Sequence, residues 1–140
     1  MQGLVLRLQP GEDLRAAIEA AVARETGGGS AFVLSGIGSL SRASLRLAGA
    51  PEATLIEGDL ELLTLAGSVS PDGAHLHASL ARADGSLIGG HVTQGCVVRT
   101  TAELLLATLP QWQLGREPDP ATGYAELVAR RLSSQGGSAT

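Results

Sequence analysis

The chain has 140 residues and a formal net charge of −4 at pH 7, and its ten basic residues other than histidine are all arginine. A protein that neutralises many phosphates usually presents a basic face, so this balance argues against a stand-alone nucleic-acid binder. The length fits one domain, and no stretch reaches the roughly 20 apolar residues of a membrane span. The single cysteine, Cys96, excludes an intrachain disulfide, and the first residues lack the layout of a signal peptide. We therefore expect a cytoplasmic protein without a membrane partner.

Apolar spacing predicts a first strand, one principal helix and then a series of strands. The helix follows Pro10-Gly11 and the acidic pair Glu12-Asp13, which suits a helix N-terminus. The segment 35–39 is interpreted as a turn, because it lacks the lysine and the following helix of a phosphate-binding loop, and Gly58-Asp59 is interpreted as a second break. The expected elements are strands at 2–8, 31–37, 42–47, 54–57, 60–69, 74–82, 86–98 and 102–109, a helix at 14–24, and a short helix at 124–132.

These elements predict an α/β (α+β) fold in which a mainly antiparallel, curved sheet of about seven to eight strands carries one principal helix. The runs 62–63 and 104–106 are apolar on both faces, as expected of strands that are buried on both sides. One helix cannot shield both faces. Either the sheet closes into a monomeric barrel or subunits cover each other, and we expect a homo-oligomer. The domain is expected to span 1–132, followed by a disordered tail at 133–140.

The three histidines of the chain fall within a short segment that reads as a β-hairpin. Its turn, Ala83-Asp84-Gly85, is typical of a three-residue hairpin loop with a left-handed glycine. Counting back from this loop pairs His77 with His91. His75 and His77 then share one face of a strand, and His91 joins them across the ladder, where opposed Cβ atoms lie roughly 4.5–5.5 Å apart.

Three imidazoles that converge on one face predict a metal site with His75, His77 and His91 as ligands. Three neutral imidazoles and an open fourth position suit Zn²⁺ best, although other borderline divalent ions also fit. The alternative is that the polar face of this hairpin simply faces water. A register slip of one residue would move His91 to the opposite face, so the prediction depends on the turn.

Three further residues are weaker candidates beside the expected metal. Glu103, on the strand after the hairpin, is a candidate to orient an imidazole or to act as a general base for a water activated by the metal; an exposed strand-end acid is the alternative. Arg99 and Thr100 are candidates for binding an anion, with a solvated strand end as the alternative. Cys96 is expected to point away from His91 and to serve as a small buried hydrophobe.

Three segments of the chain have a distinctive sequence. They are GIGSLSRASLR at 36–46, EGDLELLTLAG at 57–67, and a highly specific block at 75–103 that contains HLHASLA, DGSLIGGH and GCVVRTTAE. Together they resemble the plants-and-prokaryotes-conserved (PPC) domain family. The resemblance extends over about residues 3–130 and implies a small α/β domain, with a mainly antiparallel sheet and one principal helix, that assembles as a homotrimer.

The resemblance also bears on metal and DNA. Some prokaryotic members carry a metal at histidines that match His75, His77 and His91, whereas plant members generally lack these histidines. Plant members place the domain behind AT-hooks, which are Arg-Gly-Arg-Pro segments that enter the DNA minor groove. This chain contains no such segment, although prokaryotic members are often labelled as DNA-binding.

Three functions are compatible with these features. The one we favour is a trimeric module that binds a metal and an unknown small-molecule ligand. The second is a metal-dependent hydrolase or lyase with Glu103 as the base, for which the sequence shows no substrate pocket or nucleophile. The third is a DNA-associated regulatory protein in which the domain mediates oligomerisation. Its best basic cluster, Arg42 and Arg46, is more simply explained as the solvated face of an exposed strand.

Overall fold

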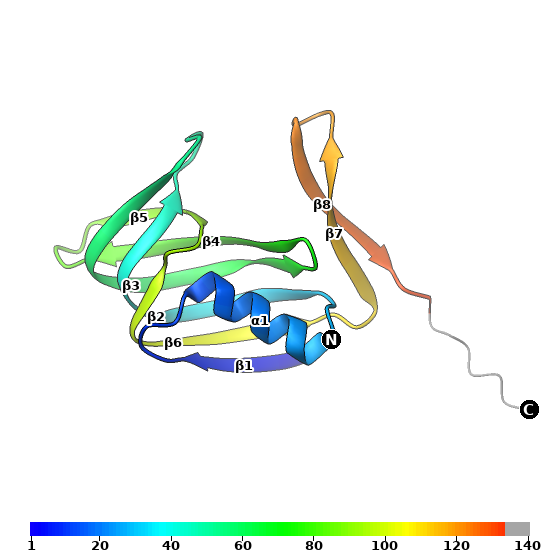
Figure 1. Ribbon diagram of the computed structural model, residues 1–140, viewed down its shortest axis with the longest axis horizontal. Coiled ribbons are helices and arrows are strands. Elements are labelled where there is room, and N and C mark those ends of the chain that lie inside the picture. Colours follow the sequence, from blue (N-terminus) through cyan, green and yellow to red (C-terminus); the bar gives the residue numbers. More distant parts are fainter. Residues whose placement is uncertain (134–140) are drawn as a thin grey trace, which may run out of the picture.

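The structure, a computed structural model, describes residues 1–133 as eight strands and one helix (Figure 1). This confirms the expected mainly antiparallel architecture with a single principal helix, since every strand pairing is antiparallel. The elements are β1 (Gln2–Leu8), α1 (Leu14–Thr26), β2 (Ala31–Arg46), β3 (Ala53–Ser70), β4 (Gly73–Arg82), β5 (Leu87–Val92), β6 (Val97–Thr108), β7 (Trp112–Asp119) and β8 (Tyr124–Arg131).

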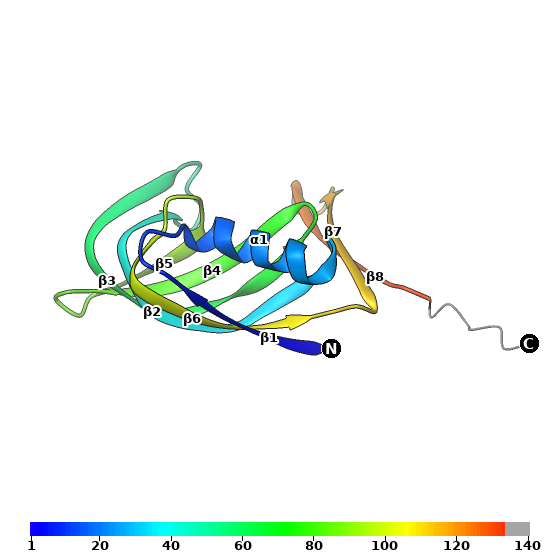
Figure 2. The same cartoon turned by 60° about the horizontal axis from the view of Figure 1, so that its bottom comes forward.

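Six of the strands form one curved sheet in the order β1-β6-β2-β3-β4-β5, and β7 and β8 form a separate two-stranded sheet. The end of β2 also pairs with β5, where Leu45 lies opposite Val92 and Arg46 opposite His91. This extra pairing curls the six-stranded sheet toward itself. Figure 2 shows the curl, with α1 lying across the sheet and the β7–β8 hairpin standing at one end. The hairpin therefore borders the main sheet without extending it.

Helix α1 packs its apolar residues onto the inner face of the sheet. Asp13 caps the helix by accepting a 2.9 Å hydrogen bond from the Ala16 amide. Leu14, Ile18 and Val22, at most 1% exposed, enter the core at helical spacing, and each buried side chain of this kind contributes roughly 1.5–3 kcal/mol of transfer free energy. Among residues 1–133, no helix is long and apolar enough to cross a membrane.

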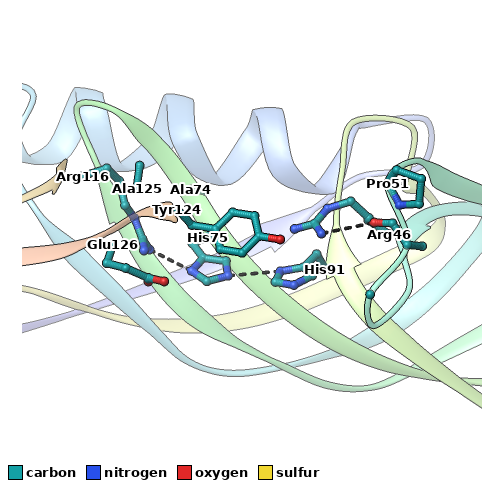
Figure 3. Close-up of a pocket in the computed structure, with 11 residues that line it drawn as sticks. Arg46, Pro51, Ala74, His75, His91, Arg116, Tyr124, Ala125 and Glu126 are labelled. Carbon is teal, nitrogen blue, oxygen red and sulfur yellow. Dashed lines mark hydrogen bonds between the residues drawn. The ribbon is translucent and has the colours of Figure 1, made fainter. Parts of the chain in front are cut away.

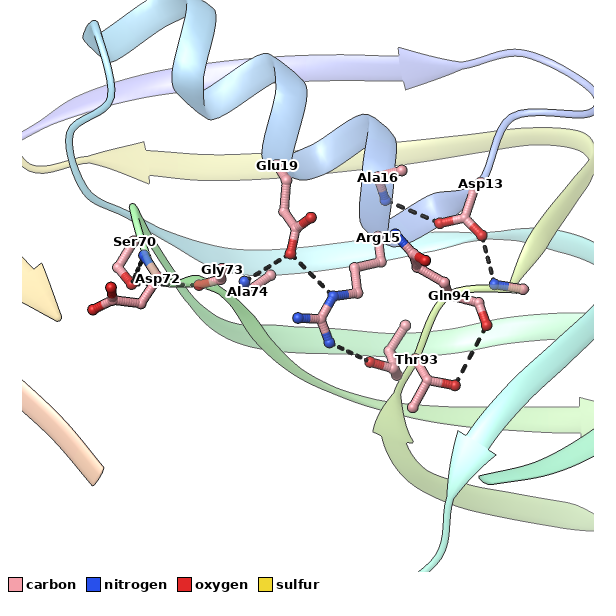
Figure 4. Close-up of polar contacts among 12 residues, drawn as sticks. Asp13, Arg15, Ala16, Glu19, Ser70, Asp72, Gly73, Ala74, Thr93 and Gln94 are labelled. Atoms are coloured by element: carbon pink, nitrogen blue, oxygen red, sulfur yellow. Dashed lines mark hydrogen bonds and ion pairs between the residues drawn. The ribbon is translucent and has the colours of Figure 1, made fainter. Parts of the chain in front are cut away.

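A polar contact fixes the helix to the β3–β4 turn (Figure 4). Glu19 accepts hydrogen bonds from the Ala74 amide at 2.8 Å and from Arg15 at 3.0 Å, and Arg15 in turn donates to the Val92 carbonyl at 3.3 Å. One helical turn thus holds the start of β4 and the end of β5. These are the two strands that carry the histidines.

The outer face of the main sheet carries a set of exposed apolar side chains, here called the outer apolar patch. Its members alternate along their strands with residues that face the core. Val5 lies opposite Leu105, and Leu105 in turn lies beside the irregularity of β2 near Ser35. The patch consists of Val5, Leu34, Ile37, Leu63 and Leu105, which are 42–78% exposed.

Two breaks predicted from glycines do not end strands. β2 runs without interruption through the expected turn at 35–39, and β3 runs through Gly58-Asp59. Irregular register marks β2 at several points instead. At Gly38, with φ +156°, a Cβ atom would lie 2.4 Å from the Thr101 carbonyl oxygen. The lack of a side chain at Gly38 lets β2 pack closely against β6. The strand therefore continues through a bend at the place where the sequence analysis expected it to end.

The prediction of a short helix at 124–132 is wrong, because this segment forms strand β8. It pairs along its whole length with β7, from Trp112 opposite Arg131 to Asp119 opposite Tyr124. Ala, Glu, Leu and Arg favour helices intrinsically, but here pairing with a neighbouring strand overrides that preference. Glu126 and Val128 are half-buried between exposed neighbours, which is a period of two. The expected tail at 133–140 lies, apart from Ser133, outside the described residues.

Candidate metal centre and its pocket

The hairpin of β4 and β5 has the register that its turn predicts. His77 lies opposite His91, and Leu80 lies opposite Ile88. The Arg82 amide donates to the Ser86 carbonyl at 2.8 Å, and Gly85 takes the left-handed conformation with φ +82°. The turn thus places all three histidines on the outer face of the sheet, as expected.

The three imidazoles meet with their ring nitrogens close together. His75 Nε2 lies 3.1 Å from His77 Nε2 and 3.1 Å from His91 Nδ1. One nitrogen of each ring falls within 4.8 Å of the other two, so the group can hold a metal ion. The rings of His75 and His91 are stacked at 5.1 Å between centroids, while His77 meets both of them edge-on. The donor set fits a divalent ion that prefers nitrogen ligands.

The surroundings of the cluster favour uncharged imidazoles. Burial lowers the pKa of His75 below its ordinary value of 6.5, and the nearby Arg116 guanidinium lowers it further. Burial also lowers the pKa of His91, with smaller effects from His77 and from Arg46. Because only a neutral imidazole has a free lone pair to offer, these shifts keep two of the three rings in the form that binds metal.

One contact works against metal binding at His75. Arg116 Nη2 lies 2.9 Å from His75 Nδ1 and 2.9 Å from Ser68 Oγ. Arginine only donates, so His75 Nδ1 accepts, and the proton of the neutral ring then belongs on Nε2. That is the nitrogen that faces the other two rings. A His75 that binds metal through Nε2 carries its proton on Nδ1, which requires Arg116 to turn away.

A pocket opens beside the histidines and reaches the β7–β8 hairpin (Figure 3). Its volume is about 710 Å³, within the range of roughly 300–1,000 Å³ that is typical of small-molecule sites. The main sheet contributes His75, His91 and Arg46, and the hairpin contributes the other polar groups. The residues that line the pocket are Arg46, Gly49, Ala50, Pro51, Ala74, His75, His91, Arg116, Tyr124, Ala125 and Glu126.

Four of these pocket residues were missed as site residues: Arg46, Arg116, Tyr124 and Glu126. The sequence analysis explains Arg46 as part of a solvated strand face, yet its backbone pairs directly with His91. The other three lie more than 20 residues beyond the last histidine. Tyr124 and Glu126 lie in the segment incorrectly predicted as a helix, and Arg116 lies in β7, for which no element was predicted. The period of two in β8 is the one signal that was available, and it is short.

The predicted Glu103, Arg99 and Thr100 lie elsewhere. They line a different hollow together with Ser39 and Glu61. Arg99 forms a 3.3 Å ion pair with Asp59, and the Thr100 hydroxyl is 2.6 Å from that of Ser39. None of the pockets described in residues 1–133 joins Glu103 to a histidine. The acid that does line the histidine pocket is Glu126.

Cys96 occupies the position that alternation predicts. It is 1% exposed and packs against Ser44, whose amide donates to the sulfur at 3.3 Å. Burial raises the pKa of its thiol, so the group stays uncharged and unreactive. It takes no part in the histidine cluster.

Relatives of known sequence and structure share this fold. The bifunctional protein GlmU of Synechococcus sp. strain JA-2-3B'a(2-13) is 50% identical over 122 residues, which are 87% of this chain and 19% of that protein. The chain thus spans about a fifth of the length of that curated relative. A hypothetical protein from Salmonella enterica superposes with a TM-score of 0.89 at 34% identity, covering 93% of this chain and 94% of the other.

A third relative is described as metal-containing. This protein from Archaeoglobus fulgidus superposes with a TM-score of 0.75 at 29% identity and covers 91% of this chain and 94% of its own. The family model of the Plants and Prokaryotes Conserved (PCC) domain, the family that the sequence motifs resemble, matches residues 1–110. The match includes the main sheet, the helix and all three histidines, and ends before the β7–β8 hairpin. The chain belongs to the Plants and Prokaryotes Conserved domain family.

Proposed function

We propose that this protein is a metal-binding module that holds a divalent ion, with zinc the best fit, at His75, His77 and His91. The observation that carries the proposal is the convergence of three ring nitrogens within 4.8 Å of one another on the β4–β5 hairpin. Two of the rings have a pKa below the ordinary value, which favours binding at neutral pH. The metal-containing relative from Archaeoglobus fulgidus adds support from within the same fold.

The site leaves room for more than the ion. Three histidine ligands leave at least one coordination position of zinc open, and two of these histidines, His75 and His91, line the 710 Å³ pocket. When bound, the ion supplies a Lewis acid that polarises an oxygen of a ligand. The protein contributes a fixed ligand geometry, two arginines and one carboxylate around the same space. These features support a binding or regulatory role, with the ion and a small molecule side by side.

We further propose that the module is a homotrimer. The outer apolar patch leaves Val5, Leu34 and three other large apolar side chains 42–78% exposed on one face of the sheet, and contiguous exposed apolar surface marks sites of association. A single helix covers only the opposite face. The number three comes from the family resemblance. A mass of three times 14.2 kDa in sedimentation, reduced to that of one chain by Leu105→Glu, tests this assembly.

The alternatives have less support from this chain. A DNA-associated role requires a basic face, and the net charge is −4. A hydrolase or lyase that uses Glu103 as base requires this carboxylate at the metal, and Glu103 lines a different hollow. We therefore favour metal and ligand binding over both.

Metal analysis of the protein without an affinity tag tests the site. After zinc loading and removal of excess ion, we expect about one ion per chain by mass spectrometry, since three ligands converge once per chain. His77→Ala is expected to lose it. Ser79→Ala, two residues further along the same strand, is the matched control and keeps the ion. Wild-type protein that stays metal-free, or a His77→Ala variant that binds as wild type does, contradicts the proposal.

A further inference from the structure

We infer that the pocket between the histidines and the β7–β8 hairpin binds a small molecule through an oxyanion group, a carboxylate or a phosphate, held by Arg46, Arg116 and the Tyr124 hydroxyl. This inference rests on the proposed function, because two of the proposed ion ligands, His75 and His91, line the pocket. It adds the chemical class of the ligand and the residues that select it. Two of the three selecting residues lie outside the segment that the family model matches.

The first argument is charge. Arg46 and Arg116 both line the pocket, together with a single acidic residue, Glu126. Within residues 1–133 neither guanidinium forms an ion pair, although the backbone amide of Arg116 donates to Asp72 Oδ2 at 2.8 Å. The arginines that do form ion pairs are Arg15, Arg24, Arg99 and Arg130. Two half-buried guanidinium groups without a carboxylate partner favour an anion in the space between them.

The second argument is the number of free donors. Arg46 makes one long contact, from Nη1 to the Ala50 carbonyl at 3.5 Å. A guanidinium carries five N–H donors in a planar fork that matches two oxygens of a carboxylate or phosphate. The Tyr124 ring extends across the pocket from β8 with its hydroxyl on the Arg46 side (Figure 3). Guanidinium and phenol thus present donors to the same region.

The third argument links the anion to the ion. To hold a metal through Nε2, His75 would have to carry its ring proton on Nδ1, and Arg116 would then lose the acceptor to which it donates at 2.9 Å. The Arg116 guanidinium lines the same pocket as Arg46, and an oxyanion would offer it a new acceptor. Anion and metal are therefore expected to strengthen each other's binding.

The other lining residues and the volume of the pocket indicate the size and polarity of the rest of the ligand. Pro51, Ala74 and Ala125 add apolar surface to the pocket wall, with Pro51 beside Arg46 and Ala125 beside Arg116 (Figure 3). The volume of about 710 Å³ accommodates a molecule larger than a bare ion. The geometry thus fits a small acid whose charged group faces Arg46 and whose body contacts apolar side chains.

Calorimetric titration tests the inference with two probes, malonate and inorganic phosphate, on zinc-loaded and on metal-free protein at low ionic strength. At least one anion is expected to bind, with affinity about tenfold lower in Arg46→Gln, because a charge-assisted hydrogen bond is lost. Tyr124→Phe, which removes only the hydroxyl, is expected to weaken binding less. Arg42→Gln is the matched control, since Arg42 lies on the same strand but is exposed and outside the pocket. Tighter binding of malonate identifies a carboxylate ligand, and tighter binding of phosphate a phosphate ligand.

Two results overturn the inference: neither anion binds to either form, or Arg46→Gln binds as wild type does. Equal loss in Arg42→Gln and Arg46→Gln also overturns it, because the effect is then one of overall charge. Metal content is measured on the same samples. If no zinc is taken up, the proposed metal site fails, and the titration of the metal-free protein still decides whether the pocket binds anions through Arg46.

Discussion

The main sheet and the β7–β8 hairpin meet at one pocket but are built very differently. The six-stranded sheet encloses a continuous core, which includes Leu40, Leu65 and Leu80 at 0–1% exposure. The hairpin buries one apolar side chain, Leu114, at 3% exposure, and otherwise holds to the sheet by hydrogen bonds from Leu114 and Arg116. The sheet fixes the histidines rigidly, whereas the hairpin completes the pocket through few contacts. The proposed ion site and the residues proposed to select the ligand thus lie in parts of the molecule that are expected to differ in stability.

The largest effect is expected from Gly67→Ala in the sheet. A Cβ atom at Gly67 would lie 2.0 Å from the His75 carbonyl oxygen, and the residue has φ +149°. We expect a loss of roughly 2–5 kcal/mol in the free energy of unfolding, because strand β3 must move away from β4. Urea denaturation measures this loss, and zinc affinity should fall with it. Gly123→Ala, in the turn of the hairpin, is the comparison and should leave zinc affinity unchanged. Wild-type stability in Gly67→Ala would show that β3 and β4 are not so closely packed.

Leu114→Ala tests how the hairpin is attached. It removes the buried apolar anchor of the hairpin, at an expected cost of about 2–3 kcal/mol to local docking. Hydrogen exchange should accelerate at the amides of β7 and β8 while those of β2, β3 and β6 remain protected. Leu127→Ala, on the same hairpin but 41% exposed, serves as the control and should change exchange little. Uniform acceleration throughout the chain would mean that sheet and hairpin unfold as one unit.

Arg116 and Glu126 are expected to affect metal affinity in opposite directions. Arg116→Gln removes a strict donor from His75 Nδ1, which should raise zinc affinity roughly tenfold, in line with other outer-shell partners of ligating histidines. Glu126 is the one acidic residue that lines the pocket, and we expect its carboxylate to accept a hydrogen bond from His75 Nδ1 when a metal is bound. Glu126→Gln should therefore lower zinc affinity by a similar factor. Competition with a chelator dye measures both. Arg130→Gln, whose guanidinium pairs with Glu117 on the same hairpin, is the control. Unchanged affinity in both variants would exclude the hairpin from metal binding.

The smallest expected effect concerns the pH dependence of stability without metal. The folded-state pKa values of His75 and His91 lie below the ordinary 6.5, so the unfolded chain binds more protons just below pH 6.5. The free energy of unfolding should therefore fall as the pH is lowered from 6.5 through these pKa values. Urea denaturation at pH 7.5 and 5.5 should show a smaller difference in the double variant His75→Gln and His91→Gln. An equal difference in both proteins would assign the pH dependence to other groups.

The histidine cluster was predictable because its geometry is local. A three-residue turn with glycine at its end fixes the pairing of His77 with His91 without information from the rest of the chain. Arg116 contacts His75 across 41 residues of sequence, and Tyr124 and Glu126 reach the pocket only because β8 pairs with β7. Their positions depend on tertiary contacts that no short pattern contains. The same reason explains the incorrect helix at 124–132, whose residues prefer a helix until a neighbouring strand is present.

The bends at Gly38 and at the irregular positions of β2 were missed for a related reason. The sequence alone does not show whether a glycine ends a strand or lies inside a strand and lets a neighbouring backbone approach closely. Only the 2.4 Å approach of the Thr101 carbonyl to the place of a Cβ atom distinguishes the two. The prediction of one principal helix and about eight mainly antiparallel strands was nevertheless confirmed. Its strands differ in detail, because β2 and β3 each join two expected strands, and β7 and β8, which were not expected, form a sheet of their own beside a main sheet of six strands.

The two open ends of the β7–β8 hairpin lie side by side. The Leu132 amide donates to the Gln111 carbonyl at 2.9 Å, directly outside the pair formed by Trp112 and Arg131. Because the first and last residues of the hairpin lie next to each other, another hairpin with the same end-to-end spacing can replace it without altering the strands that carry the histidines. Grafting β7–β8 from a relative onto this sheet would replace Arg116, Tyr124 and Glu126 in the proposed ligand pocket while retaining Arg46 and the three histidines. The part of the pocket that the hairpin supplies would thus vary at one junction.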